Sequence, residues 1–76
     1  MKEIRPYRVT FLAKKDGQTR WRVDVEAYNA PEAEKKVAAR WGAAHNERGK
    51  KPQMFEVTVR RLGEDEAFQP RFTREV

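Results

Sequence analysis

The sequence predicts an α+β fold: a small ββαβ domain with a three-stranded antiparallel sheet in the order 2-1-3, one helix packed on one face, and room for a short fourth strand at the C-terminus. Two observations carry this prediction. Three segments alternate apolar and polar residues with the period of two that is typical of strands. One segment between the second and the third repeats apolar residues every three or four positions, as a helix with one buried side does. With 76 residues, the chain has room for one hydrophobic core.

The first two alternating segments form a predicted hairpin. In the first segment, one face carries Tyr7, Val9 and Phe11, and the other carries Arg8 and Thr10. The second segment has an apolar face of the same kind, made of Trp21, Val23, Val25 and Ala27. Its other face is polar and carries Arg20, Arg22, Asp24, Glu26 and Tyr28.

The loop between these strands is assigned by the pairs of residues that it would place opposite each other. A two-residue turn at Asp16 and Gly17 would put Phe11 opposite Arg22, and so mix the apolar face with the polar one. A three-residue loop over 15–17, with Gly17 in the left-handed region as a bulge, keeps each apolar residue opposite another. The expected pairs are Phe11 with Trp21, Val9 with Val23, Tyr7 with Val25, Arg8 with Asp24, and Thr10 with Arg22.

A helix is predicted to begin after Asn29, whose side chain suits the N-cap position, with Pro31 in the first turn and Glu32 at the capping-box position. Gly42 is expected to weaken or end its last turn, because glycine is a poor helix former. The stripe that should face the sheet recurs at spacings of four, four and three, and consists of Ala33, Val37, Trp41 and Ala44.

The segment 45–53 is polar and is predicted to be a loop. The third strand is predicted over 54–62, with Phe55, Val57 and Val59 on its apolar face. Because the helix joins the second and third strands as a crossover, the third should run parallel to the second. That direction places it antiparallel against the free edge of the first. The polar face of the sheet is then left to water or to a partner.

The chain is predicted to divide into a ββαβ domain over 1–62 and an acidic-then-aromatic C-terminal tail over 63–76. The tail opens with an acidic run and has no decisive period after it. Two outcomes are open: a tail that is frayed or ordered by a partner, as is common for termini, or a short fourth strand. Such a strand would alternate through Phe72, Arg74 and Val76.

Few residues in the chain are suited to catalysis. There is one histidine, His45, with no cysteine and no serine, and a lone histidine of this kind is typically a surface residue. The acidic residues lack zinc or EF-hand spacing, and the glycines stand apart, so no standard phosphate-binding loop is formed. We therefore expect no enzyme, no cofactor and no metal. No apolar run has the length of a membrane span or of a signal peptide, and we expect a cytoplasmic protein.

The formal net charge of +5 is unevenly distributed. Residues 1–62 carry 15 Lys and Arg against 8 Asp and Glu, whereas residues 63–76 carry 2 against 4. The densest positive region spans 35–51. Clustered cations release condensed counterions when they neutralise the phosphates of a nucleic acid. The leading hypothesis is therefore non-specific contact with the backbone of DNA or RNA. The alternative is that these residues form only a solvated helix face and loop. The predicted contacts are Lys35, Lys36, Arg40, Arg48, Lys50 and Lys51.

A second hypothesis is a protein-interaction module. The polar sheet face mixes charges of both signs, which cross-strand ion pairs within the sheet would explain. Such a mixture also suits a protein partner better than a uniform phosphate backbone. The aromatic residues of the tail have no evident core position and are candidate anchors. The layout of hairpin, helix and strand also resembles many small phage-encoded accessory proteins and inhibitors, and an open edge of the second or third strand would allow a homodimer. The candidate contacts are Arg8, Arg20, Arg22, Arg60, Phe68 and Phe72.

Overall fold

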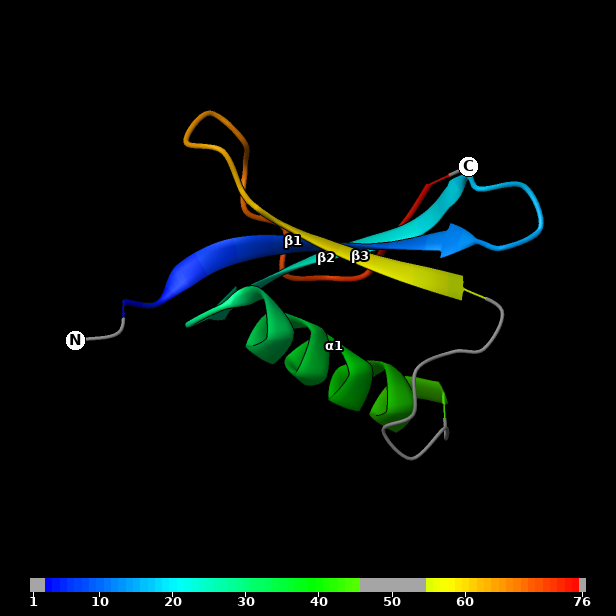
Figure 1. Cartoon of the computed structure of the whole chain (residues 1–76), viewed down its shortest axis with the longest axis horizontal. Helices are drawn as coiled ribbons and strands as arrows, with labels where there is room; N and C mark the ends of the chain where they lie inside the picture. The colour runs from blue at the N-terminus through cyan, green and yellow to red at the C-terminus, as the bar shows by residue number, and fades with distance from the viewer. Residues whose placement is uncertain (1–2, 46–54, 76) are drawn as a thin grey trace.

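One helix lies against one face of a four-stranded antiparallel sheet in the computed structural model, which describes residues 3–45 and 55–75 (Figure 1). The elements follow the order β1 (Arg5–Ala13), β2 (Thr19–Ala27), α1 (Ala30–His45), β3 (Phe55–Arg61) and β4 (Thr73–Arg74). In space the strands are ordered β3-β1-β2-β4. The predicted α+β class and the 2-1-3 order of the three long strands are confirmed. Of the two outcomes left open for the tail, the structure has the short fourth strand.

The hairpin of β1 and β2 has the predicted register from Arg5 to Phe11. Phe11 faces Trp21, and the other four expected pairs are also present. The turn itself differs from the prediction. Ala13 N donates to Gln18 O at 2.9 Å, which leaves a loop of four residues, 14–17, in place of three. If that pairing continued along both strands, Phe11 would lie opposite Arg20. One additional residue in β2 next to the turn, a β-bulge, shifts the register and keeps the apolar residues on one face.

Gly17 closes this turn in the left-handed region, with a φ of 71°. Its N–H donates to Ala13 O at 2.7 Å. The predicted backbone conformation of Gly17 is therefore confirmed, although the bulge lies in β2 rather than at the glycine.

Asn29 caps the N-terminus of α1 as the sequence predicts, whereas Glu32 binds the N–H of the residue before the N-cap rather than that of Asn29 itself. Asn29 Oδ1 accepts a hydrogen bond from Glu32 N at 2.9 Å, and Glu32 Oε1 accepts one from Tyr28 N at 3.2 Å. The helix continues past Gly42 to His45, so the expected weakening at Gly42 does not end it. The side chains predicted to face the sheet are buried at Ala33, Val37 and Trp41; that of Ala44 lies outside the described residues.

The core lies between α1 and the apolar face of the sheet. Val9, Phe11 and Val23 are almost fully buried at its centre. The ring of Phe11 lies 4.8 Å from that of Trp41, measured between centroids, and Phe55 and Phe72 surround this pair. Phe72 comes from the C-terminal tail, so the expectation that no core position accommodates it is wrong.

The C-terminal tail crosses the polar face of the sheet and then runs along the outer edge of β2. Asp24 N donates to Gln69 O at 2.8 Å, β4 pairs with β2, and Glu75 N donates to Arg20 O at 2.7 Å. The polar face is therefore partly covered by the chain itself, which corrects the expectation that it is left to water or a partner. Within residues 3–45 and 55–75, no helix has the length and apolar character needed to cross a membrane.

Candidate nucleic-acid interface

Two of the six predicted phosphate contacts lie on the same side of α1, one turn apart. Lys36 Nζ donates to Glu26 O at 3.0 Å and lies 3.3 Å from a carboxylate oxygen of Glu32. Arg40 Nη2 donates to Pro70 O at 2.7 Å. Both side chains are exposed and are held at the line where α1 meets β2 and the C-terminal tail.

The guanidinium of Arg40 also stacks over an aromatic ring. Its carbon atom lies 5.3 Å from the centroid of Phe72, a distance at which a cation and a ring face attract each other. A lysine has three N–H donors and an arginine five. The anchoring bonds of Lys36 and Arg40 therefore leave donors on each side chain for a further acceptor.

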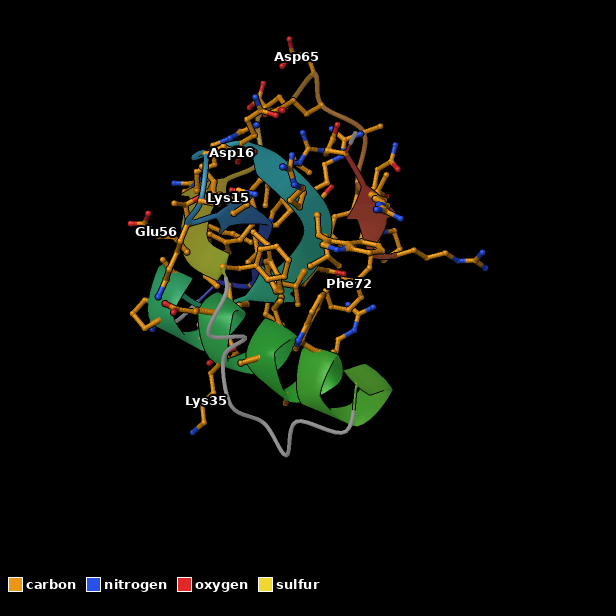
Figure 2. The ribbon with its side chains drawn as sticks, turned by 90° about the vertical axis from the view of Figure 1, so that its right-hand side faces the viewer. Lys15, Asp16, Lys35, Glu56, Asp65 and Phe72 are labelled. Atoms are coloured by element: carbon orange, nitrogen blue, oxygen red, sulfur yellow. The ribbon has the colours of Figure 1, made fainter. Side chains whose placement is uncertain are left out.

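Lys35 takes a different direction from its neighbour. It is exposed, and Figure 2 shows its side chain pointing away from the sheet, whereas Phe72 lies between β4 and α1. The remaining predicted contacts, Arg48, Lys50 and Lys51, lie outside the described residues.

Two further cations come from the tail, which runs along the outer edge of β2. Arg71 directly follows Pro70, whose carbonyl is bound by Arg40. Arg74 is the register partner of Trp21, and the Trp21 ring packs edge-on against Trp41 of α1 with 6.2 Å between centroids. Both arginines are exposed and form no ion pair within the part of the chain that the structure describes. We refer to Lys36, Arg40, Arg71 and Arg74 as the cationic edge.

The spacing of charges in the tail could have identified Arg71 and Arg74 as a separate positive group, but the net charge of the tail does not show it. Residues 63–76 sum to a negative charge, but the negative residues are concentrated at 64–66 and the arginines follow at 71 and 74. The fold separates the two groups, because Glu66 is bound on the polar sheet face by Arg8 and Arg60, whereas the arginines lie in the segment that runs along the outer edge of β2. The one acidic residue after them, Glu75, lies 3.0 Å from Arg22 Nε.

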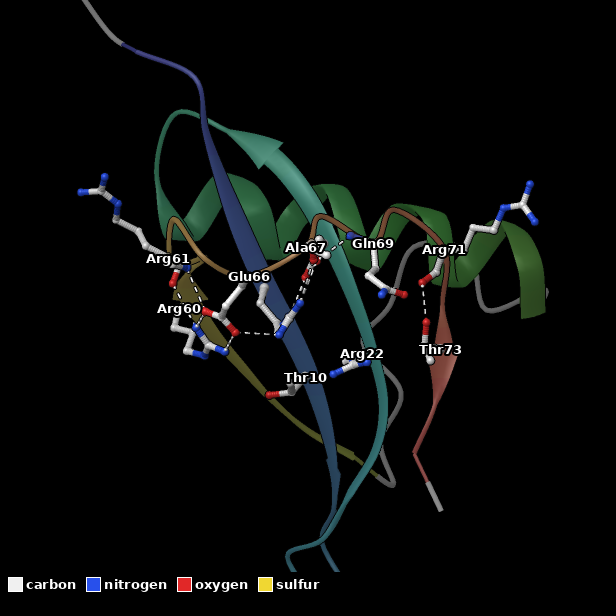
Figure 3. Close-up of polar contacts among 12 residues, drawn as sticks. Thr10, Arg22, Arg60, Arg61, Glu66, Ala67, Gln69, Arg71 and Thr73 are labelled. Atoms are coloured by element: carbon white, nitrogen blue, oxygen red, sulfur yellow. Dashed lines mark hydrogen bonds and ion pairs between the residues drawn. The ribbon is translucent and has the colours of Figure 1, made fainter.

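The polar sheet face holds a network that ties the tail to the sheet (Figure 3). Arg8 and Asp24 form a bidentate ion pair, with Nε 2.9 Å from Oδ1 and Nη2 3.1 Å from Oδ2. Arg8 Nη1 also donates to Glu66 at 2.9 Å, and Nη2 donates to the carbonyl of Ala67 at 3.2 Å. Asp24 accepts a further bond from Gln69 N at 2.7 Å. Sequence reasoning placed Asp24 on an exposed face, but it is fully buried.

Glu66 lies between two guanidinium groups. Arg60 binds both of its carboxylate oxygens at 2.7 Å, and Gly63 N donates to one of them at 2.8 Å. The hydrogen bonds from Arg60 and then from Gly63 lower the pKa of Glu66 to about 2. The hydrogen bond to Asp24 raises the pKa of Arg8 above its ordinary value. Arg8 and Arg60, predicted as protein contacts, are thus bound to the chain's own acidic residues.

The other candidate protein contacts are divided between the core and the surface. Arg20 Nη2 lies 2.6 Å from Asp16, and Arg22 pairs with Glu75, so both arginines have partners within the chain. Phe72 is half-buried and packs against the core, whereas Phe68 is 42% exposed. Phe68 lines an open groove of about 530 Å³ at the end of the sheet together with Ile4 and Leu62 and with charged residues of both signs, among them Arg5, Arg61 and Glu64.

The fold and these surfaces define a small α+β protein with a cationic edge and a self-bound polar face. Comparisons with protein-family models, with curated protein sequences and with solved structures gave no significant match. In residues 3–45 and 55–75, no group of three or more His, Cys, Asp or Glu side chains is arranged to hold a metal ion.

Proposed function

We propose that this protein is a small non-catalytic module that contacts the phosphate backbone of nucleic acid through α1 and the adjoining tail. The observation that carries the proposal is the cationic edge, where four exposed cations from two distant segments follow the line along which α1, the outer edge of β2 and the tail meet. Lys35 lies on the same helix, and Arg48, Lys50 and Lys51 follow it in the sequence. The proposal places the protein in the cytoplasm.

The chemistry of the cationic edge suits phosphate groups. Three of its four members are arginines, whose planar guanidinium can donate two parallel hydrogen bonds to phosphate oxygens. Lys36 and Arg40 are held in place by backbone carbonyls, so less side-chain freedom is lost when an anion binds. Nothing in this arrangement reads base edges, and the proposed binding is independent of nucleotide sequence.

Fluorescence anisotropy with labelled single- and double-stranded DNA and RNA, at low and at physiological salt, tests the proposal. Wild-type protein should bind at low salt and lose affinity steeply as salt rises. The double variant Arg71→Glu/Arg74→Glu should bind more weakly, and its salt slope on duplex DNA should fall by about 2, since each lost phosphate contact removes about 0.9. The double variant Lys50→Glu/Lys51→Glu tests, by the same measurement, two of the phosphate contacts that the sequence predicts.

The matched control is Lys14→Glu/Lys15→Glu. These hairpin lysines are exposed and form no ion pair within the described residues, and reversing them changes the net charge by the same amount. Equal weakening by the control and the edge variant would mean that overall charge, and not the cationic edge, drives binding. No binding by the wild type at low salt would overturn the proposal.

The groove around Phe68 favours a second candidate function, an accessory or inhibitory module that binds a protein. Two of its apolar side chains, Ile4 at 55% and Phe68 at 42%, are among the most exposed large hydrophobic residues of the described chain. Exposed apolar groups rimmed by charges are typical of protein contacts. Cross-linking of a partner that is lost in Phe68→Glu but retained in Arg71→Glu/Arg74→Glu would support this function, and capture that is insensitive to Phe68→Glu would contradict it.

A further inference from the structure

The two outer strands of the sheet differ in how they are covered. On one side, the outer edge of β2 is bound by Gln69, by β4 and by Glu75. On the other side, β3 is the last strand, and no strand of the described chain pairs with its outer edge. An uncovered edge offers a row of N–H and C=O groups to any strand that can match it.

The hydrogen bond between Leu62 N and Pro6 O, at 3.0 Å, shows which backbone groups of β3 face outward. Leu62 directs its N–H toward β1, and successive residues of a strand alternate in direction. The even-numbered residues of β3 therefore bond to β1. The odd-numbered residues, Phe55, Val57, Val59 and Arg61, direct their N–H and C=O groups to the open edge.

We propose that β3 pairs with β3 of a second copy of this chain, antiparallel and about a two-fold axis at Thr58. In this register all seven residues of β3 are paired. Val57 faces Val59 of the second copy and Phe55 faces Arg61, and these are the hydrogen-bonded pairs, because all four residues direct their backbone groups outward. Thr58 faces itself.

Charge complementarity selects this register. Glu56 faces Arg60 of the second copy, and symmetry produces this pair twice. Both residues fall at non-hydrogen-bonded positions, where opposed side chains lie closest, at about 4.5 Å between Cα atoms. Glu56 is exposed and has no ion pair among the described residues. Arg60 binds Glu66 and Arg61 O through Nη1 and Nη2 and keeps Nε–H for a further acceptor.

The neighbouring registers match less well. Moving the axis to Val57 or Val59 keeps each face intact but pairs only five residues of β3, and it places Glu56 or Arg60 opposite Thr58. If one copy were shifted by a single residue relative to the other, apolar side chains would lie opposite polar ones. In the register centred on Thr58, the half-buried row of Phe55, Val57 and Val59 also meets the same row of the second copy. This contact would bury additional apolar surface, which matters in a domain with a small core.

Each copy carries a net charge of +5, which opposes association at long range. At physiological ionic strength the Debye length is about 8 Å, so this repulsion is largely screened while the contacts between strands are not. The association should therefore be measured at physiological salt.

A single cysteine provides a test of the register, since the chain contains no cysteine of its own. Thr58→Cys places two thiols opposite each other at the axis, in a geometry that permits a disulfide. Glu56→Cys, two residues away on the same face, is the matched control, because its counterpart in the second copy lies opposite position 60. Under mild oxidation, Thr58→Cys should form a cross-linked dimer at least about tenfold faster than Glu56→Cys. Equal rates, or no cross-link in Thr58→Cys, would overturn the proposal.

Hydrogen exchange on the unaltered protein tests the same pairing without a substitution. At concentrations where sedimentation shows a dimer, the amides of Val57 and Val59 should be protected, and dilution should release them while Thr58 and Arg60 stay protected by β1. A protein that remains monomeric at the highest attainable concentration would contradict the proposal. A dimer whose Val57 and Val59 amides exchange freely would contradict it equally, since the copies would then meet elsewhere.

Discussion

Arg8 and Asp24 face each other across β1 and β2 and are joined by two hydrogen bonds, of 2.9 and 3.1 Å. The side chain of Asp24 is fully buried and that of Arg8 is 11% exposed. A charge pair on the outer face of a three-stranded sheet would normally lie in water. Here the tail covers it, and Glu66, Ala67 and Gln69 satisfy the remaining donors and acceptors.

Replacing Asp24 by asparagine should destabilise the protein strongly. The substitution keeps the shape and an acceptor for Gln69 N but leaves the Arg8 charge buried without its first partner. Removing one member of a buried ion pair costs about 3 kcal/mol or more. Urea unfolding at neutral pH measures the change. Glu26→Gln is the control, because Glu26 is exposed on the same strand, and its effect should stay within about 0.5 kcal/mol; similar losses in both variants would contradict the role of the buried pair.

Glu66 should make the stability depend on pH on the acid side. Its pKa is about 2 in the folded protein, against an ordinary value of 4.5, so the unfolded chain binds more protons between these values. The contribution is fully present above pH 4.5 and is lost as the pH falls through 2. Glu66→Gln should therefore lower the unfolding free energy at neutral pH and approach the wild type near pH 2. A difference between the two proteins that stays constant with pH would contradict this assignment.

Phe72 should hold the tail against β2. Phe72→Ala removes a half-buried ring that packs against Phe11 and Trp41, and about 2 kcal/mol of stability, roughly half the cost for a fully buried phenylalanine, should be lost. The amide of Asp24, which donates to Gln69 O, should exchange faster in hydrogen exchange followed by NMR. Phe68→Ala is the control, since Phe68 is exposed, and it should leave that amide protected.

Gly17→Ala should destabilise the hairpin by about 1 kcal/mol, because an alanine at a φ of 71° brings its Cβ close to the backbone. Beyond Gly17 and its two chain neighbours, no atom lies within 4 Å of the position that a Cβ would occupy, so the cost comes from the local backbone conformation rather than from a clash with another part of the fold. Gly17→Asn should lose less, since asparagine tolerates this region better. Thermal unfolding of both variants measures the order; an equal loss would point to a cause other than φ.

The sequence predicts the hairpin and the helix well because their determinants are local. The alternation of Tyr7, Val9 and Phe11 sets the register, since a slip by one would expose the whole apolar face. Asn29 and Glu32 set the start of α1 within four residues of each other. The length of the turn was predicted one residue too short, because a bulge in β2 gives the same pairing of apolar residues as the expected bulge at Gly17.

The tail could not be placed in this way. Its contacts join Arg8 to Glu66 and Asp24 to Gln69, residues far apart in the sequence, and neither partner shows a pattern that identifies the other. Asp24 alternates like a surface residue, and its burial depends on a segment that crosses the sheet later. The same fold brings Pro70, the residue before Arg71, against Arg40 and pairs Arg74 with β2, so a prediction confined to the helix and its loop omits half of the cationic edge.

The position of Glu66 and Gln69 after β3 affects the order in which the sheet is completed. The three long strands and the helix can associate before residues 66–75 cover Asp24 and the outer edge of β2. Such an intermediate would have both sheet edges open and the Arg8–Asp24 pair in water. Open edges invite pairing between chains. We therefore expect chains with an undocked tail to aggregate more readily than the folded protein, in which, among the strands that the structure describes, only the edge of β3 remains open.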